Sequence, residues 1–329
     1  MESHNHLNKV SDPLRPKQLQ DFCGQPNLKR DLNILIKAAL SRSQMPDHIL
    51  LSGPAGTGKT TLASIIANEL SVEMISTSSP AIEKPGDIAS LLTSLRGPTL
   101  VFIDEIHRLD KKSEELLYSA MEDGVLDFII GEGPSSRSVR LPVPAFTLVG
   151  ATTLSGLLAT PLRDRFGFDG RLSLYSDNEL SSIVLRSAEL LGVEVSKDAA
   201  KIIASRSRGT PRVANKLLRR VRDYVQVKRG LESTVISKRD SIKALDSFGI
   251  DSLGLDTLGR EILVALIKKF NGGPVGISTL ATAVGEAPQT IEEVYEPHLL
   301  RCGLIARTNR GRVAMPLAYE HLDLKELAQ

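Results

Sequence analysis

Short apolar runs alternate with amphipathic stretches through the N-terminal half of the chain, a pattern that predicts a parallel α/β domain. Three of the runs are candidates for buried strands, at residues 48–52 (HILLS), 99–103 (TLVFI) and 146–150 (FTLVG). A stretch that predicts a helix follows the first run at 60–70, and another lies between the second and third at 113–122. The expected domain is therefore a parallel sheet with flanking helices.

A second pattern, two short runs around a turn, predicts a β-hairpin before the third strand. The runs cover 125–130 and 138–143, and Gly131-Glu132-Gly133-Pro134 between them has the composition of a turn. Three apolar residues precede this turn, namely Phe128, Ile129 and Ile130. They either pack on the sheet or form an exposed patch on which a partner docks.

The C-terminal half has a different pattern. Residues 176–247 are helical throughout. Three predicted helices follow, at 258–270, 278–284 and 288–302, and then two short apolar runs flank Asn309-Arg310-Gly311. Three helices followed by a small hairpin are the layout of a winged helix.

Length agrees with this division, because 329 residues are too many for one core of ordinary size. We expect a large α/β domain over 1–174, a small all-α domain over 175–248 and a winged helix over 249–329. The composition, with 41% hydrophobic and 24% charged residues, is typical of a soluble globular protein.

Net charge and cysteine content limit the classes of function. The formal net charge of +2 does not by itself indicate nucleic acid, so a DNA signal must come from local clusters. Cys23 and Cys302 have no metal-ligand spacing, which favours free thiols in a reducing compartment. The N-terminus lacks an apolar signal core, and the longest apolar run near the C-terminus, 262–267, is far shorter than the ~20 residues that span a bilayer. We expect a cytoplasmic protein with no membrane partner.

The chemistry begins after the first strand, where residues 53–60 read GPAGTGKT and match G-x-x-x-x-G-K-[ST]. Gly56 and Gly58 let the backbone N–H groups surround a phosphate, and the following helix points its positive end at the same charge. Lys59 should reach the β and γ phosphates of ATP, and the Thr60 hydroxyl should bind Mg²⁺. The alternative, a plain glycine turn between strand and helix, does not require the complete motif.

Two carboxylates follow the second strand, and this is where ligands bind in open α/β sheets. Asp104 would hold Mg²⁺ through water, and Glu105 would orient or polarise the attacking water. The third strand ends in Ala151-Thr152-Thr153, where a hydroxyl either contacts the γ-phosphate or only caps the strand. Arg165 in Arg163-Asp164-Arg165 either stabilises the charge on the transferring phosphoryl group or forms a surface salt bridge.

Together these motifs resemble the RuvB family of AAA+ ATPases, which drive branch migration of Holliday junctions in recombination and repair. The resemblance covers nearly the whole chain. Its most specific segments are 104–108 (DEIHR), 161–167 (PLRDRFG), 208–215 (RGTPRVAN) and 272–276 (GGPVG). It implies an AAA+ P-loop core, a small helical lid and a winged helix. It also implies ATP and Mg²⁺ as cofactors and a homo-hexameric ring around double-stranded DNA. The implied partners are four-way junctions, a RuvA-type junction-binding protein and, indirectly, a RuvC-type resolvase.

The resemblance also implies roles that spacing alone leaves open. Arg15 would lie near the adenine and Tyr175 near the base. Thr153 or Thr152 would be the sensor on the central strand. Arg165 would be an arginine finger that reaches into the neighbouring subunit's site. The further nucleotide contacts that the resemblance implies are Arg212 as a second sensor on the lid, with Leu14, Thr61, Glu122, Asp123 and Gly124.

The basic residues of the C-terminal half carry the DNA prediction. Residues 201–229 hold a cluster of Lys and Arg that we interpret as a solvated helical face together with the sensor arginine. Arg307, Arg310 and Arg312 lie on or beside the small hairpin with no acid near them in sequence, which suits contact with phosphate. The resemblance names Arg307 and Arg312 as DNA contacts, and it places partner docking on the hairpin of the first domain. Sequence-indifferent, salt-sensitive binding is expected.

Other ATPase classes remain alternatives. An ATP-dependent assembly switch also joins such a core to a winged helix, but it hydrolyses slowly where a motor turns over repeatedly. A clamp-loader subunit would carry a Ser-Arg-Cys finger and a helical collar, whereas this chain has Leu-Arg-Asp-Arg at 162–165. A protein-unfolding ring is disfavoured because no aromatic pore loop stands before Asp104.

Overall fold

The structure, a computed structural model, describes residues 12–130, 137–230 and 235–324, with no side chains described at 128–138. The chain forms two compact units. One comprises residues up to Glu179 together with Thr210–Arg212, and the other comprises Leu180–Gly209 and Val213 onward. In the three described stretches, no helix combines the length and apolar character needed to cross a membrane.

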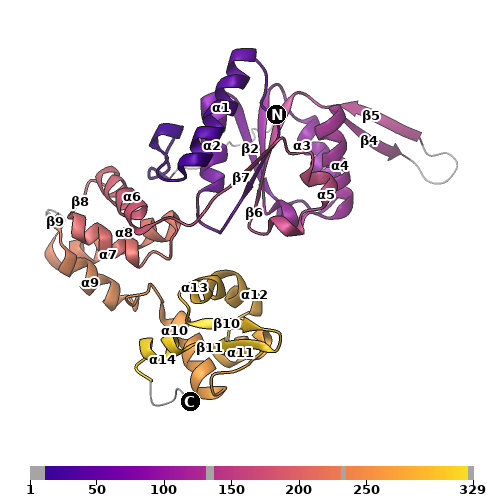
Figure 1. The fold of residues 1–329 in the computed structure, drawn as a ribbon. Coiled ribbons are helices and arrows are strands. Elements are labelled where there is room, and N and C mark those ends of the chain that lie inside the picture. The colour runs from indigo at the N-terminus through magenta and orange to yellow at the C-terminus, as the bar shows by residue number, and fades with distance from the viewer. Residues whose placement is uncertain (1–11, 131–136, 231–234, 325–329) are drawn as a thin grey trace, which may run out of the picture. The chain divides into compact units, whose positions relative to one another are not determined.

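The first unit is built on a five-stranded parallel sheet with the order β2-β3-β6-β1-β7 (Figure 1). Its strands are β1 (Ile49–Ser52), β2 (Glu73–Ser78), β3 (Thr99–Asp104), β6 (Phe146–Thr152) and β7 (Phe168–Arg171). The three predicted strands are confirmed as β1, β3 and β6, which occupy the middle of the sheet. The edge strands β2 and β7 carry polar residues and glycine, and the apolar pattern did not predict them.

Both faces of the sheet are covered, which explains why its central strands are continuous apolar runs. Alternate residues serve opposite faces: Ile49 and Leu51 belong to one core cluster, and Leu50 belongs to the other. The first cluster contains residues of α1 (Pro26–Arg42) and α2 (Lys59–Leu70), and the second contains residues of α3 (Pro85–Thr93) and α4 (Lys111–Asp123). Shorter helical turns complete the unit: η1 (Leu19–Asp21), η2 (Ser79–Ala81), η3 (Ile106–Arg108), η5 (Ser155–Leu157) and α5 (Thr160–Arg163).

The predicted hairpin is confirmed. It consists of β4 (Val125–Ile130) and β5 (Arg137–Pro142), which pair antiparallel and extend away from the main sheet (Figure 1). Arg140 Nε donates to Asp127 Oδ1 at 2.9 Å across the two strands. The predicted turn at Gly131-Glu132-Gly133-Pro134 lies outside the described residues.

The second unit contains the predicted helical segment, but the prediction of helix throughout was wrong at 194–195 and 235–236, which form two short strands. Its helices are α6 (Asp177–Leu190), α7 (Lys197–Ser205), α8 (Pro211–Arg229) and α9 (Lys238–Ser247), with a short parallel pair between β8 (Glu194–Val195) and β9 (Val235–Ile236). Ser196 and Ser237 cap α7 and α9 by accepting backbone N–H groups of the first turn.

A winged helix completes the second unit, as predicted. Two of its three expected helices contain a π-helical turn. The elements are α10 (Thr257–Val264) with η6 (Ala265–Lys269), α11 (Ile277–Val284), α12 (Pro288–Thr290) with η7 (Ile291–Tyr295) and α13 (Glu296–Arg301), β10 (Ile305–Thr308), β11 (Gly311–Ala314) and α14 (Pro316–His321). The strands β10 and β11 form the wing, with Arg307 opposite Arg312.

Candidate functional site

The loop between β1 and α2 has the backbone of a phosphate cradle. Gly53, Gly56 and Gly58 have φ values of 137°, 78° and 112°, which side-chain-bearing residues rarely adopt. A Cβ on Gly53 would lie 2.3 Å from the Leu172 carbonyl oxygen, so a larger residue does not fit there. The Gly53 N–H donates to the Thr152 carbonyl at 3.1 Å and fixes the loop to the central strand. The glycines therefore hold the loop in a shape that presents N–H groups to a phosphate.

Lys59 begins α2 and turns back over this loop. Its Nζ donates to the carbonyl oxygens of Gly53 at 2.7 Å and Pro54 at 3.0 Å. Burial is the main reason that the pKa of Lys59 falls to about 8; nearby Asp104 opposes this shift and Arg212 adds to it. Among the described residues, the groups that bind the ammonium directly are these two neutral carbonyls, so an anionic phosphate can take their place.

The acidic pair lies at the end of β3, at the same edge of the sheet. Asp104 Oδ1 accepts the backbone N–H of Glu105 at 2.9 Å. Glu105 has a φ of 52°, and its carboxylate accepts from Arg108 Nη1 at 2.9 Å. The Thr60 hydroxyl and the Asp104 carboxylate supply oxygen ligands, which Mg²⁺ prefers. The side chains present at this edge therefore fit a nucleotide with its metal ion.

The structure distinguishes the two threonines at the end of β6. Thr152 is fully buried, its Oγ1 is 2.9 Å from His107 Nδ1, and it accepts the Leu154 N–H at 2.9 Å. Thr153 is exposed. The hydroxyl of Thr152 is thus used inside the protein, whereas that of Thr153 faces solvent.

Several predicted nucleotide contacts surround the P-loop. Tyr175 is 5% exposed and its hydroxyl donates to the Thr57 carbonyl at 3.1 Å; burial is the main cause of its raised pKa. The backbone N–H of Arg212 donates to the Gly56 carbonyl at 3.4 Å, which brings this lid residue to the phosphate loop. Leu14 is buried and Arg15 is exposed.

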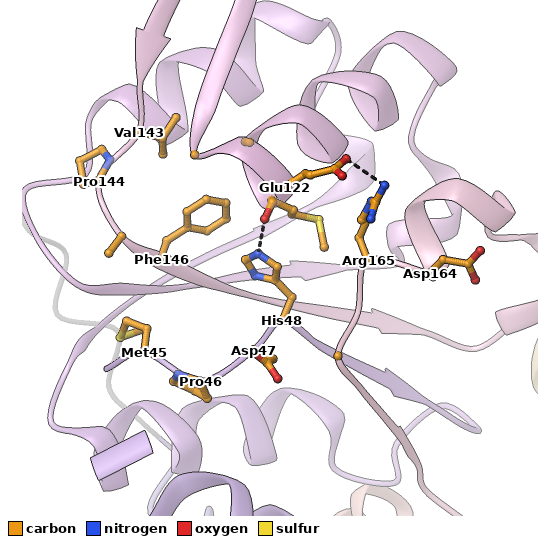
Figure 2. Close-up of a pocket in the computed structure, with 15 residues that line it drawn as sticks. Met45, Pro46, Asp47, His48, Glu122, Val143, Pro144, Phe146, Asp164 and Arg165 are labelled. Carbon is orange, nitrogen blue, oxygen red and sulfur yellow. Dashed lines mark hydrogen bonds and ion pairs between the residues drawn. The ribbon is translucent and has the colours of Figure 1, made fainter. Parts of the chain in front are cut away.

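Arg165 binds residues near the end of α4, and Figure 2 shows its side chain directed toward Glu122. Its Nη2 donates to the Tyr118 hydroxyl and to Glu122 Oε2, the latter at 2.9 Å. Arg165, Glu122 and Gly124 line a cavity of about 550 Å³, and the ring of His48 also points into it (Figure 2). His48 Nε2 lies 3.3 Å from the Met121 carbonyl, and burial is the main cause of its lowered pKa.

The remaining predicted nucleotide contacts lie near these groups. Thr61 is half-buried in the first turn of α2. Asp123 is the exposed last residue of α4, and Gly124 ends that helix with a φ of 64°.

The wing holds the three arginines of the DNA prediction in two environments. Arg307 and Arg310 are exposed. Arg312 has a side chain only 8% exposed, and its Nη2 donates to Glu296 Oε2 at 2.8 Å. Glu292 Oε1 lies 3.4 Å from both Arg307 Nη2 and Arg312 Nη2. Direct phosphate contact by Arg312 would require the buried ion pair to open, so that part of the interpretation stays a prediction.

The proposed docking residues Phe128, Ile129 and Ile130 lie on β4, paired with Val139, Ser138 and Arg137. Their side chains are outside the described part of the structure, so docking stays a prediction.

The sequence interpretation missed some partners of the predicted residues. Tyr118 binds Arg165 from 47 residues away, and Glu296 binds Arg312 from 16 residues away. The sequence did contain a signal for Tyr118. It lies four residues before Glu122 on one predicted helix, so the two side chains share a face and can contact the same partner. The acids that pair with the wing arginines lie on a different predicted element, the helix at 288–302, and so do not stand beside the hairpin in the sequence.

Comparison with known proteins places these features in a family. Residues 14–172 match the model of the Holliday junction DNA helicase RuvB P-loop domain, 175–251 the RuvB AAA lid domain and 252–323 the RuvB C-terminal winged helix domain. The Holliday junction branch migration complex subunit RuvB of Fusobacterium nucleatum is 52% identical over 327 residues, which are 99% of this chain and 97% of that protein.

Solved structures agree. The Thermotoga maritima RuvB Holliday junction branch migration motor superimposes with a TM-score of 0.84 and 46% identity, over 95% of this chain and 99% of that one. A mutant of the same protein gives a TM-score of 0.86 and 46% identity, also over 95% and 99%. With all three family models matched in order along its length, the chain belongs to the RuvB family of ATP-dependent Holliday junction branch-migration motors.

Proposed function

We propose that this branch-migration ATPase hydrolyses ATP with Mg²⁺ at a site that a neighbouring subunit completes. The subunits would form a homo-hexameric ring that moves duplex DNA at four-way junctions in the cytoplasm. A RuvA-type protein would hold the junction, and a RuvC-type resolvase would act on it indirectly. The Fusobacterium nucleatum relative is named as a subunit of a complex, which supports the need for a partner. We also propose the division into domains at 1–174, 175–248 and 249–329.

Within one subunit the residues at the carboxyl edge of the sheet would bind and orient the triphosphate. Lys59 would leave the Gly53 and Pro54 carbonyls for the β and γ phosphates. Thr60 and Asp104 would hold Mg²⁺, whose charge offsets that of the phosphates when it is bound. Glu105 would orient the attacking water once its carboxylate turns from Arg108.

The rest of the nucleotide contacts would come from the surroundings of the loop. Thr153, exposed at the end of the central strand, is the better candidate for the sensor, because the Thr152 hydroxyl is used by His107. Arg212, held at Gly56 through its backbone, would place its guanidinium at the γ-phosphate. Arg15 and Tyr175 would lie near the adenine base of the nucleotide. The other proposed contacts are Leu14, Thr61, Glu122, Asp123 and Gly124.

The contacts of Arg165 carry the proposal of a shared site. Its guanidinium binds Tyr118 and Glu122 at the end of α4, whereas the charges that act on Lys59 are those of Asp104 and Arg212. Arg165 is half-exposed, and the cavity that it lines has no residue of 53–60 among its described lining residues, which suits a role in the neighbouring subunit's site. There it would stabilise the charge that develops on the γ-phosphate.

Arg307 and Arg310 on the exposed side of the wing would contact DNA phosphates, and Arg312 would join them only if its ion pair with Glu296 opens. Phosphate contact carries no sequence information, which suits a motor that moves any junction. Binding should weaken steeply with salt. A strongly preferred DNA sequence would argue against this arrangement.

Partner docking would use Phe128, Ile129 and Ile130 on β4. Ile129→Asp should abolish stimulation by the RuvA-type partner and leave basal hydrolysis intact. Loss of both activities together would show instead that Ile129 packs within the domain.

The test of the proposal is steady-state ATP hydrolysis with and without duplex DNA and the RuvA-type protein. Wild type is compared with Glu105→Gln and Arg165→Ala. DNA and partner should raise turnover severalfold, and both substitutions should abolish it. Low turnover that DNA does not change would identify an assembly switch. Recovery of activity on mixing Arg165→Ala with Lys59→Ala subunits would place Arg165 in its neighbour's site.

A further inference from the structure

The side chain of Arg165 is fixed from one face of α4. Tyr118 contacts it twice: the phenol oxygen accepts a hydrogen bond from Nη2, and the ring centroid is 4.6 Å from Cζ. Glu122 lies one helical turn later and accepts from the same Nη2 at 2.9 Å. The Nε of Arg165 is buried and has no hydrogen-bond partner among the described residues. The guanidinium is therefore oriented by its outer nitrogen and by the ring.

The two partners differ in what they can do when a phosphate arrives. Glu122 is an exposed anion, so it competes with phosphate for the same cation. Tyr118 is neutral and half-buried, and its ring attracts the cation whatever anion the guanidinium meets on its other side. Only the tyrosine can keep its contact through the reaction without opposing the nucleotide.

We propose that Tyr118 is a positioning residue for hydrolysis: it holds the Arg165 guanidinium in the orientation that meets the phosphates in the neighbouring subunit's site. The inference rests on the proposed action of Arg165 across the interface. An arginine has several rotatable bonds, and misplacement of a catalytic group by about 1 Å can cost on the order of 100-fold in rate. Tyr118 restricts the conformational freedom of Arg165 before the subunits assemble into a hexamer.

Hexamers mixed from two variants test this directly. Tyr118 should affect ATP hydrolysis when it is changed in the subunit that donates the arginine, and not when it is changed in the subunit that holds the nucleotide. Lys59→Ala subunits serve as donors, since they keep Arg165 but lack the phosphate lysine. Arg165→Ala subunits serve as acceptors, since they keep the P-loop but lack the arginine. The parent mixture should regain DNA-stimulated hydrolysis. Tyr118→Leu is then added to the donor in one mixture and to the acceptor in another.

The expected result is asymmetric. Tyr118→Leu in the donor should lower the recovered kcat by roughly 10- to 100-fold, with the KM for ATP changed by less than about twofold. The same change in the acceptor should leave the recovered activity within about twofold of the parent mixture, because the acceptor contributes no arginine. Tyr118→Phe in the donor keeps the ring and loses the hydroxyl, so it should lower kcat by only about threefold to tenfold.

Each other outcome overturns the proposal in a recognisable way. Equal losses from donor and acceptor would mean that Tyr118 only stabilises the domain, and thermal unfolding of the single variant would confirm that. No loss from either placement would mean that Glu122 alone positions the arginine. If the parent mixture recovers nothing, then Arg165 does not act across the interface, and the proposed function fails at that point together with this inference.

Discussion

Lys59 in the first unit and Arg312 in the second are both buried cations that a phosphate could bind, but different groups hold them. Lys59 donates to two neutral carbonyls, and burial lowers its pKa to about 8. Arg312 donates to Glu296, which is itself 2% exposed, and it also meets Glu292. Among the described residues Lys59 forms no salt bridge, although Asp104 acts on it electrostatically, whereas Arg312 is held in an ion pair. The first arrangement favours binding of a phosphate, and the second favours a stable local fold.

The largest effect should come from Lys59→Met. Nucleotide-dependent hydrolysis should fall to background, since the β and γ phosphates lose their cation. The thermal stability of the ligand-free protein should stay the same or rise, because the variant no longer buries a charge whose direct partners in the described structure are two carbonyl oxygens. Calorimetry without nucleotide and an ATPase assay check both parts. A large loss of stability would show that the lysine is structural and would end the contrast with Arg312.

Arg312→Met should act in the opposite sense. It leaves the Glu296 carboxylate buried without a partner, which costs about 3–5 kcal/mol of unfolding free energy for a buried pair. Chemical denaturation of the full chain measures this. The double variant Arg312→Met with Glu296→Leu should regain most of the loss, since it removes both charges. If the single variant unfolds like wild type and binds DNA weakly, then Arg312 is a DNA contact and not a structural residue.

A pH titration should separate the two cations. Above a pKa of about 8 the ligand-free Lys59 loses its proton, and a bound triphosphate restores it. Nucleotide binding should therefore take up a proton and weaken as pH rises, by up to about tenfold between pH 8 and pH 9. Binding calorimetry in buffers of different ionisation enthalpy measures the uptake. Lys59→Arg is the matched control and should show none. Equal proton uptake by both proteins would assign the titration to another group.

The smallest expected effect is a change in DNA affinity on substitution of Glu292. Its Oε1 lies 3.4 Å from Arg307 Nη2, so this carboxylate competes with DNA phosphate for the arginine. Glu292→Gln should tighten duplex binding by about twofold to fivefold, the range expected for an exposed ion pair. Glu293→Gln is the matched control, because its carboxylate accepts from Gln289 and, among the described residues, from no arginine. Salt titrations of DNA affinity compare the two variants. An equal gain from both would reflect general charge rather than release of Arg307.

The sequence predicted those features that are determined by residues adjacent to one another in the chain. Contiguous residues were enough to predict the P-loop, the pair Asp104 and Glu105, and the three central strands, because each is recognised from its own short segment. The edge strand β2 was missed because its residues are exposed or half-buried and carry no apolar run. The pairing of Arg312 with Glu296 was missed because α13 brings the acid to the wing only after folding.

The candidate site shows the same division. Sequence analysis selected Thr152 and Thr153 together, and only the contact with His107 distinguishes them. It left open whether Arg165 forms a salt bridge or serves in catalysis. The structure shows the contact with Glu122 and adds Tyr118, and neither contact by itself excludes catalysis. Residues that act through a partner distant in sequence cannot be recognised before that partner is located.

The order of the strands has a consequence for biosynthesis. β1 carries the P-loop and is the first strand of the sheet to leave the ribosome, yet its neighbours are β6 and β7. Chains lengthen by roughly 5–20 residues per second, so for several seconds β1 exists with both of its edges unpaired. Unpaired apolar edges are the places where chains aggregate. The nucleotide loop is thus among the first motifs to be synthesised and among the last parts of its domain to be held in place.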